Sequence, residues 1–161
     1  MASAVDAQSN QETPKFSLAI RAGQSEVALG SDIDLYLTLT NTSQESLLIS
    51  YSYGRGFPSG FHCDLRDGQG ELVPRIGKRY KQFPNGDRME IPPPPYSVIP
   101  GGGKIQPGES IKEFVKISNI YQFDHPGKYT IQVSRKESWS PTVYSNIITV
   151  TVAGGAPLTK P

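Results

Sequence analysis

The chain has 161 residues, which suits one domain with an apolar core of its own. Its 16 Lys and Arg against 15 Asp and Glu give a net charge of +1, which is not the signature of a general nucleic-acid-binding or acidic-membrane-binding protein. Gly (16) and Pro (14) are frequent, which favours many short strands joined by turns and disfavours long helices.

Residues 1–14 are polar, with scattered Ala and Ser, and we expect them to form a disordered lead-in. They lack the charged start and apolar centre of a secretion signal, although a leader removed from behind an added Met would leave such a start. No apolar run in the chain approaches the length of a membrane span.

Alternation of apolar and polar side chains predicts seven to nine strands within a sandwich domain at 15–152. In the clearest strand, 32–40, Leu35 and Leu37 share one face and polar residues occupy the other. Further strands are expected at 16–21, 27–29, 47–53, 61–65, 72–73, 111–117, 128–135 and 143–152. The connector 119–123 is expected to hold at most one helical turn, and 153–161 to form a flexible tail.

Residues 74–108 differ in composition from the rest of the chain. Proline and glycine are too dense there for a central strand, so we expect a long surface excursion with polyproline II at Ile91–Pro95. Loops of this length in compact domains tend to be functional or disordered. The alternative is an ordered cover, in which Tyr80, Phe83 and Ile91 pack on a sheet.

Together these signals predict an all-β fold, an immunoglobulin-like Greek-key β-sandwich with one long Pro/Gly-rich loop. The Cys…Trp…Cys pattern of antibody domains is missing, because Cys63 is the only cysteine and Trp139 lies in a loop-like stretch. A jelly roll or a small barrel is the alternative architecture.

Several turn and strand motifs resemble a known pattern. They are 37–43, 67–70, 106–110, 120–124, 126–131 and 145–150. The chain resembles the immunoglobulin-like sandwich domains of uncharacterised exported bacterial proteins, and more distantly the intracellular proteinase-inhibitor domain of bacilli. The resemblance covers about residues 16–152, supports the fold better than any activity, and carries over no inhibitory residue. It implies a secreted or periplasmic protein, with the cytoplasm as the alternative.

Residues suited to catalysis or metal binding are few. His62 and Cys63 are neighbours in a predicted strand, so they face opposite sides of the sheet and cannot act as a nucleophile–base pair. We expect Cys63 to be a buried thiol. Neither a Gly-x-Ser-x-Gly nor a His-Glu-x-x-His motif occurs, and Gly101–Lys104 lacks the spacing of a phosphate loop. The sequence therefore predicts no enzyme, no metal site and no cofactor.

The strongest candidate for binding is the excursion. Residues 74–104 hold six cations and two acids, a net charge of +4, so the remainder of the chain carries about −3. Aromatic side chains are interleaved with the cations, and Arg and Tyr are enriched where surfaces bind partners. With a second Gly-rich turn included, the predicted binding residues are Arg75, Lys78, Arg79, Tyr80, Lys81, Phe83, Arg88, Tyr96, Arg55 and Phe57.

These observations predict a non-catalytic protein-interaction or adhesion-type module that uses the basic aromatic loop 74–104. One alternative is a protease inhibitor that presents a proline-stiffened loop, because rigid loops lose little entropy on binding. The other is a carbohydrate-binding domain that uses Tyr and Trp faces. We expect a protein partner, or a glycan in the last case, and we expect neither nucleic acid as a ligand nor a membrane span.

Overall fold

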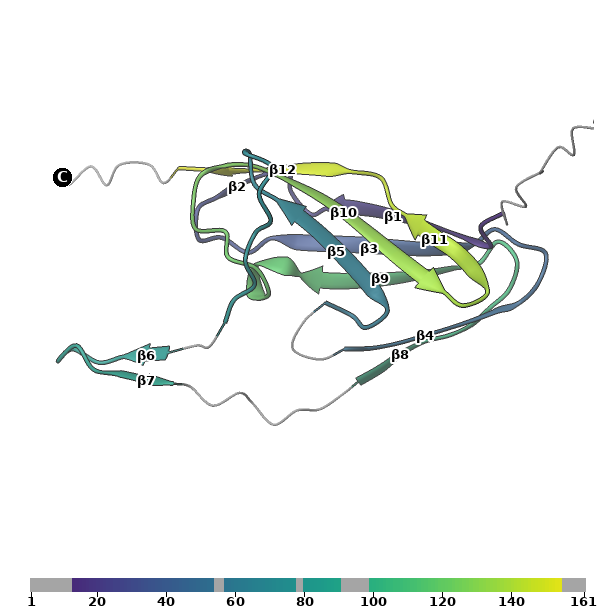
Figure 1. The fold of residues 1–161 in the computed structure, drawn as a ribbon, viewed down its shortest axis with the longest axis horizontal. Helices are drawn as coiled ribbons and strands as arrows, with labels where there is room; N and C mark the ends of the chain where they lie inside the picture. The colour runs from purple at the N-terminus through teal and green to yellow at the C-terminus, as the bar shows by residue number, and fades with distance from the viewer. Residues whose placement is uncertain (1–12, 54–56, 78–79, 91–98, 155–161) are drawn as a thin grey trace, which may run out of the picture.

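The computed structural model describes residues 13–53, 57–77, 80–90 and 99–154 (Figure 1). It has β1 (Phe16–Ala22), β2 (Glu26–Ala28), β3 (Asp34–Asn41), β4 (Leu47–Tyr53), β5 (Phe61–Arg66), β6 (Tyr80–Gln82), β7 (Arg88–Glu90), β8 (Ile99–Ile105), β9 (Ser110–Lys116), the 3₁₀ turn η1 (Ile117–Asn119), β10 (Gly127–Glu137), β11 (Ser140–Tyr144) and β12 (Ile148–Ala153). The predicted polyproline segment at Ile91–Pro95 lies outside the described residues, as do most of the lead-in and of the tail.

The fold is all-β and sandwich-like, as predicted. One sheet has the antiparallel order β1–β3–β9. In the larger sheet β10 lies between β5 on one side and β11 with β12 on the other, and β2 pairs in parallel with the far edge of β12. Two ribbons of two strands each, β4–β8 and β6–β7, complete the described strands.

The core lies between the two main sheets because β3 and β10 each turn every second side chain inward. Leu35 and Leu37 from the first sheet meet Ile131, Val133 and Val150 from the second, and each of the five is at most 2% exposed. Full burial of a side chain of this size stabilises a fold by about 1.5–3 kcal/mol. The expectation that alternating apolar side chains join two layers is confirmed.

The region 74–108 is not the strand-free excursion that its composition predicts. It contains β6, β7 and β8, which raise the strands of the described residues to twelve, against the seven to nine predicted. Proline is tolerated in β8 because this strand pairs only with β4, which leaves its other side free of ladder hydrogen bonds among the described residues.

The glycines of β8 accommodate an aromatic ring. Tyr51 of β4 lies opposite Gly101, and its ring passes so close that a Cβ built on Gly101 would lie 2.4 Å from it. Gly102 has φ +91°, and a Cβ there would lie 2.1 Å from the Ile49 carbonyl oxygen. The contact with β4 therefore requires glycine at these two positions of β8. At the end of the strand, Ile105 is buried in a second apolar cluster with Phe16 and Ile49.

The predicted strand 143–152 is broken into β11 and β12. Between them Asn146 turns its amide toward β1, where its Oδ1 accepts from the Ile20 N–H at 2.8 Å and its Nδ2 donates to the Ile20 carbonyl at 2.9 Å. The side chain thus takes the place of a strand partner and links the two sheets. A sequence pattern of apolar residues gives no sign of such a break.

The chain enters β10 through a fixed turn. Tyr129 is 4% exposed, and its hydroxyl donates to the carbonyl oxygen of His125, four residues earlier, at 2.6 Å. Its ring packs edge-on against Phe123 with the centroids 4.9 Å apart. The hydrogen bond and the ring contact together hold the 123–127 segment against the start of β10.

We predict that Gly102→Ala destabilises the protein by about 2–3 kcal/mol, because the new Cβ would strain φ and collide with the Ile49 carbonyl. Urea unfolding followed by circular dichroism measures the change. Gly77→Ala is the control, since nothing lies within 4 Å of its Cβ position. Equal stability of the two variants would contradict the close approach of β4 and β8.

We predict that Tyr129→Phe lowers the free energy of unfolding by about 1–2 kcal/mol. The substitution keeps the ring packing and removes the hydroxyl, so the His125 carbonyl loses its partner. Tyr144→Phe, at a side chain that is 63% exposed, provides the matched control and should leave stability unchanged. An unchanged midpoint for Tyr129→Phe would show that the turn does not depend on this bond.

Candidate functional site

The ten predicted binding residues fall into three groups. Four of them lie outside the described residues: Arg55, Lys78, Arg79 and Tyr96. Four belong to the β6–β7 hairpin: Tyr80 and Lys81 on β6, Phe83 in the turn and Arg88 on β7. The remaining two, Arg75 and Phe57, adjoin the sandwich.

The β6–β7 hairpin (residues 80–90) is a compact unit closed by an Asn-Gly turn. Tyr80 pairs with Glu90 and Gln82 with Arg88. At the tip the Phe83 N–H donates to the Asp87 carbonyl at 2.9 Å, and Gly86 has φ +90°. Asn-Gly between two short strands is a strong hairpin signal, and this part of the excursion could have been predicted from it.

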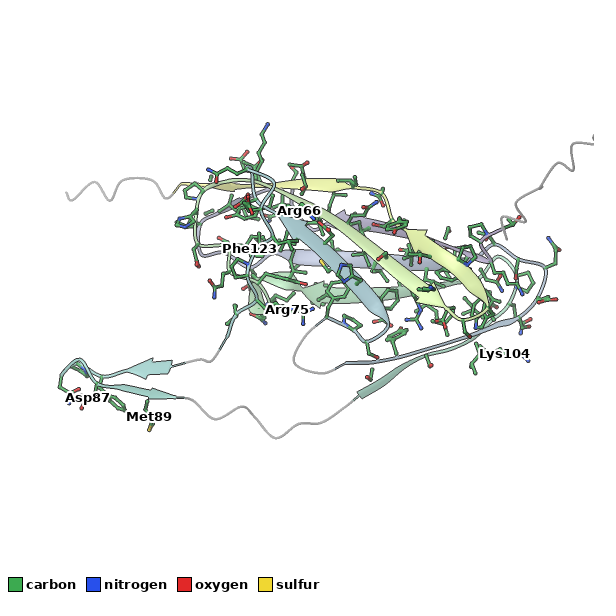
Figure 2. The ribbon with its side chains drawn as sticks, viewed as in Figure 1. Arg66, Arg75, Asp87, Met89, Lys104 and Phe123 are labelled. Carbon is green, nitrogen blue, oxygen red and sulfur yellow. The ribbon has the colours of Figure 1, made fainter. Side chains whose placement is uncertain are left out.

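The hairpin lies apart from the sandwich. Within the described part of the chain, β6 and β7 pair only with each other. Figure 2 shows Asp87 and Met89 on the hairpin, away from the main sheets, whereas Arg75 lies at the edge of the sandwich. The backbone of β6 and β7 thus pairs with neither main sheet, and Ile91 of the predicted cover lies outside the described residues.

Arg75 and Phe57 are attached to the core. The Arg75 guanidinium donates to the Tyr121 hydroxyl and lies 5.8 Å from the centroid of that ring, and the two backbones form a β-bridge. Phe57 is half-buried against the main apolar cluster. Both side chains thus have structural contacts in addition to any contact with a partner.

Cys63 is buried and has no disulfide, as expected, and the exposed His62 faces the other side of the sheet. Burial raises the pKa of the Cys63 thiol to about 11, even though the Tyr121 hydroxyl donates a hydrogen bond to it. Burial also raises the pKa of Tyr121 to about 12. At neutral pH the thiol is protonated, and a protonated buried thiol is a poor nucleophile.

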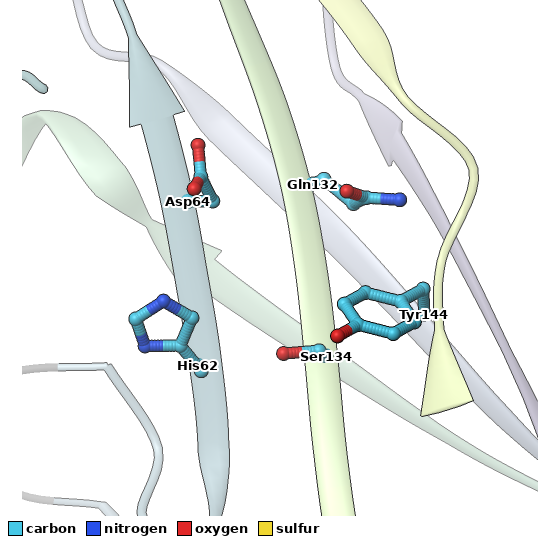
Figure 3. A pocket seen from close by; sticks show the side chains of 5 residues that line it. All are labelled: His62, Asp64, Gln132, Ser134 and Tyr144. Atoms are coloured by element: carbon cyan, nitrogen blue, oxygen red, sulfur yellow. The ribbon is translucent and has the colours of Figure 1, made fainter. Parts of the chain in front are cut away.

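A depression that no sequence pattern predicts lies on the outer face of the larger sheet. It has a volume of about 220 Å³ and is lined by five side chains from three strands: His62 and Asp64 on β5, Gln132 and Ser134 on β10, and Tyr144 on β11 (Figure 3). Register explains the grouping, because Ser134 is the direct partner of both His62 and Tyr144, and Gln132 is the partner of Asp64. We call these five residues the sheet-face site.

The hydrogen bonds of the sheet-face site leave part of its polar surface unused. Both carboxylate oxygens of Asp64 accept from Arg66, at 2.8 and 3.2 Å. Gln132 Nε2 donates to the Ser145 carbonyl at 3.0 Å, and within the described residues its Oε1 accepts no hydrogen bond. Among the described residues, no side-chain hydrogen bond joins His62, Ser134 or Tyr144 to another group.

Ser134, His62 and Asp64 are residue types of a nucleophilic relay, but their geometry differs from one. A relay needs a carboxylate that orients the histidine and a histidine that contacts the serine. Here Asp64 is held by Arg66, and no hydrogen bond between Ser134 and His62 occurs in the described residues. The arrangement offers hydrogen-bonding groups and one exposed ring on an open surface.

Metal-ligating clusters are not found in the part of the chain that the structure describes, where no three His, Cys, Asp or Glu side chains gather. Asp32 forms an ion pair with Lys116 at 2.8 Å. The described residues also contain no helix that is long and apolar enough to span a membrane.

No protein-family model matches the sequence, and no curated protein matches it. Solved structures with some likeness include a β-glucosidase from Erythrobacter marinus, at 14% identity and TM-score 0.42, which covers 87% of this chain and 16% of the glucosidase chain. The bacterial hydrophobin BslA has 17% identity and TM-score 0.36, covering 88% of this chain and 96% of BslA. AvmM, which catalyses macrocyclization in alchivemycin A biosynthesis, has 8% identity and TM-score 0.35, covering 91% and 93%.

We predict that the protein loses stability as the pH rises from 8 to 10.5. The folded pKa of Cys63, about 11, lies above the ordinary value of 9.0, so the unfolded chain releases its proton first. Stability that is present below the unfolded pKa is therefore lost as the pH rises toward the folded one. Tyr121 acts in the same direction at higher pH.

The control for this prediction is Cys63→Ala, which lacks the thiol. Its free energy of unfolding should fall by about 1–2 kcal/mol less than that of the wild type between pH 8 and 10.5. Urea titrations at both pH values measure the difference. An identical fall in the two proteins would mean that the thiol titrates normally in the folded state.

Proposed function

We propose that this protein is a non-catalytic interaction module of immunoglobulin-like Greek-key topology, which presents the basic segment 74–104, including the β6–β7 hairpin, to an acidic surface of a protein partner. The sandwich serves as the scaffold and the hairpin as the contact element. We further propose that it acts outside the cytoplasm, as the resemblance to exported bacterial domains implies.

The strand arrangement supports the immunoglobulin-like topology. In such folds the first, second, fourth and fifth strands of the chain form one layer, and the third, sixth and seventh form the other. Here β1, β3 and β9 share one sheet, as the first, second and fifth strands would, and β5, β10 and β12 share the other, as the third, sixth and seventh would. Among the described strands, none in the first sheet takes the place of the fourth. The hydrogen bond from Tyr129 to the His125 carbonyl, at the start of β10, matches the tyrosine corner of these domains.

The open sheet-face site supports a non-catalytic role. Its carboxylate is paired with Arg66 rather than with His62, and Tyr144 is 63% exposed. Catalysis relies on charged groups that are preorganised in a site from which water is excluded. Buried Cys63, with its raised pKa, supplies no activated nucleophile.

The observation that carries the proposal is the separation of the β6–β7 hairpin from both main sheets. An isolated two-stranded hairpin is at most marginally stable in water, so it gains stability by packing on something else. Among the described residues neither main sheet extends to β6 or β7 by strand pairing. Met89 is 53% exposed on the hairpin, which gives a partner an apolar contact.

Charge indicates the kind of partner. The segment 74–104 carries a net charge of +4, whereas the remainder of the chain carries about −3. The hairpin itself has two cations and two acids, so the excess of positive charge lies in the residues on either side of it, at Arg75, Lys78, Arg79 and Lys104. An acidic protein surface would be attracted to the whole segment 74–104 and repelled by the remainder of the chain, and such complementarity raises association rates and fixes orientation. The difference in charge between the segment 74–104 and the remainder of the chain favours binding through this segment, which holds the hairpin.

We predict that replacing residues 80–90 by a short Gly-Ser link abolishes partner binding and preserves the fold. The measurement is quantitative mass spectrometry of proteins captured by the wild type and by the replacement from extracellular and envelope fractions of the source cells, followed by titration of the purified partner. Thermal unfolding reports whether the sandwich remains intact.

A charge-reversal pair sharpens this experiment. The double variant Lys81→Glu with Arg88→Glu should bind the purified partner at least tenfold more weakly than the wild type. Lys112→Glu, on the exposed face of β9, should change the affinity for the partner by less than twofold. An identical set of captured proteins with and without residues 80–90 would reject the hairpin as the contact element.

A further inference from the structure

We propose that the sheet-face site binds one neutral hexopyranose unit of a glycan, independently of the β6–β7 hairpin. The site consists of His62, Asp64, Gln132, Ser134 and Tyr144, on the outer face of the larger sheet. It thus gives the molecule a second binding surface, on β5, β10 and β11 (Figure 3).

The size of the depression suits a single ring. Side chains that face each other across neighbouring strands have their Cβ atoms about 4.5–5.5 Å apart, so the row His62–Ser134–Tyr144 spans about 10 Å. Pockets for drug-sized ligands measure about 300–1,000 Å³. At about 220 Å³ the depression is smaller, and it is open to solvent, which lets an oligomer continue beyond the bound unit.

The polar groups suit hydroxyls in particular. The side chains of His62, Ser134 and Tyr144 each can donate and accept a hydrogen bond, and in the described residues none of the three is engaged by another side chain. A sugar hydroxyl likewise donates and accepts. Because all three partners have this dual character, a ring with several hydroxyls can satisfy them in more than one orientation.

The exposed aromatic ring supplies the apolar part of the contact. Tyr144 is 63% exposed, and Figure 3 shows its hydroxyl end turned toward Ser134 on β10. Tyrosine is amphipathic and loses little conformational entropy when it contacts a ligand. The C–H face of a pyranose can pack on this ring while its hydroxyls reach β5 and β10.

The charge balance favours a neutral ligand over a phosphate or a carboxylate. Asp64 contributes an anion to the lining, and no Lys or Arg belongs to it. The guanidinium of Arg66, which contacts Asp64, donates to both carboxylate oxygens of Asp64 and to the Gly70 carbonyl. An anionic ligand would therefore meet Asp64 without a free cation in the lining to neutralise it.

The experiment titrates ¹⁵N-labelled full-length protein with four neutral hexasaccharides, of β-1,4-glucose, β-1,3-glucose, α-1,4-glucose and β-1,4-mannose, and with a heparin hexasaccharide. We expect at least one neutral probe to shift the amide signals of β5, β10 and β11 saturably. Tyr144→Ala should lower the affinity for that probe at least tenfold, and Ser134→Ala should lower it about threefold.

Phe114→Ala is the matched control, since Phe114 is an aromatic side chain, 47% exposed, on β9 in the other sheet. It should leave the affinity within twofold of the wild type. Three results would overturn the proposal: no neutral probe shifts these amides at millimolar concentration, Tyr144→Ala and Phe114→Ala bind alike, or the heparin probe binds this face more tightly than every neutral one.

The replacement of residues 80–90 separates this proposal from the proposed function. A sheet-face site that acts independently keeps its glycan affinity when the hairpin is removed, even though the protein partner is lost. Loss of glycan binding in that variant, with the sandwich intact, would place the glycan on the hairpin and reject the sheet-face site.

Discussion

Strict alternation along β10 is the constraint on which the rest of the molecule depends. Tyr129, Ile131 and Val133 point inward and are at most 4% exposed, so Gln132 and Ser134 must point to solvent. One strand therefore builds the apolar core on one side and the floor of the sheet-face site on the other. A shift of its register by one residue would exchange these two roles.

The alternation continues to Arg135, where the inward position holds a charge. The guanidinium is 4% exposed and contacts Glu137 at 2.7 Å, the Ser50 carbonyl at 2.7 Å and the Phe61 ring at 4.7 Å. Because Ser50 belongs to β4, this residue joins the β4–β8 ribbon to the larger sheet. A buried charge is tolerated only with such partners, and removing one of them is strongly destabilising. Arg135 thus marks the point on β10 at which the apolar core gives way to polar contacts with the β4–β8 ribbon.

The same residue explains the glycine at the start of β5. Gly60 has φ +83°, and a Cβ on it would lie 2.7 Å from Nη1 of Arg135. A side chain at this position would collide with the guanidinium, so the close approach of the backbone to Arg135 requires glycine. Tyr51 reaches the same region and donates a hydrogen bond to Glu113 of β9, so the ribbon is tied to both main sheets by polar contacts at its Tyr51 end.

The sequence predicts those strands in which apolar and polar side chains alternate within the strand itself. The bounds of β4 were predicted as the structure has them, and the opposite facing of His62 and Cys63 followed from period two alone. β8 was not predictable in this way, because its glycines are required by the Tyr51 ring and by β4, which lie about fifty residues earlier. The Asn85–Gly86 turn carried a local signal, but its three-residue strands are too short to show alternation.

The sheet-face site was missed for a different reason. Its members span residues 62–144 and become neighbours only through the pairing of β5 with β10 and of β10 with β11. Local patterns predict which face a side chain takes, whereas register decides which side chains share that face. Alternation alone places each of the five residues on the outer face of the sheet. That they lie next to one another follows only from the pairing of the three strands.

The two proposed binding surfaces rest on different sources of stability. The sheet-face site is built on strands whose other faces fill the core, so its geometry is as rigid as the packing of Ile131 and Val133. The β6–β7 hairpin depends on its own few ladder bonds and on the Asn-Gly turn. Binding at the first surface involves little ordering, whereas binding at the second includes the free energy of holding the hairpin in place. Substitutions that loosen the sandwich should therefore affect the sheet-face site first, and the hairpin should respond mainly to its own residues.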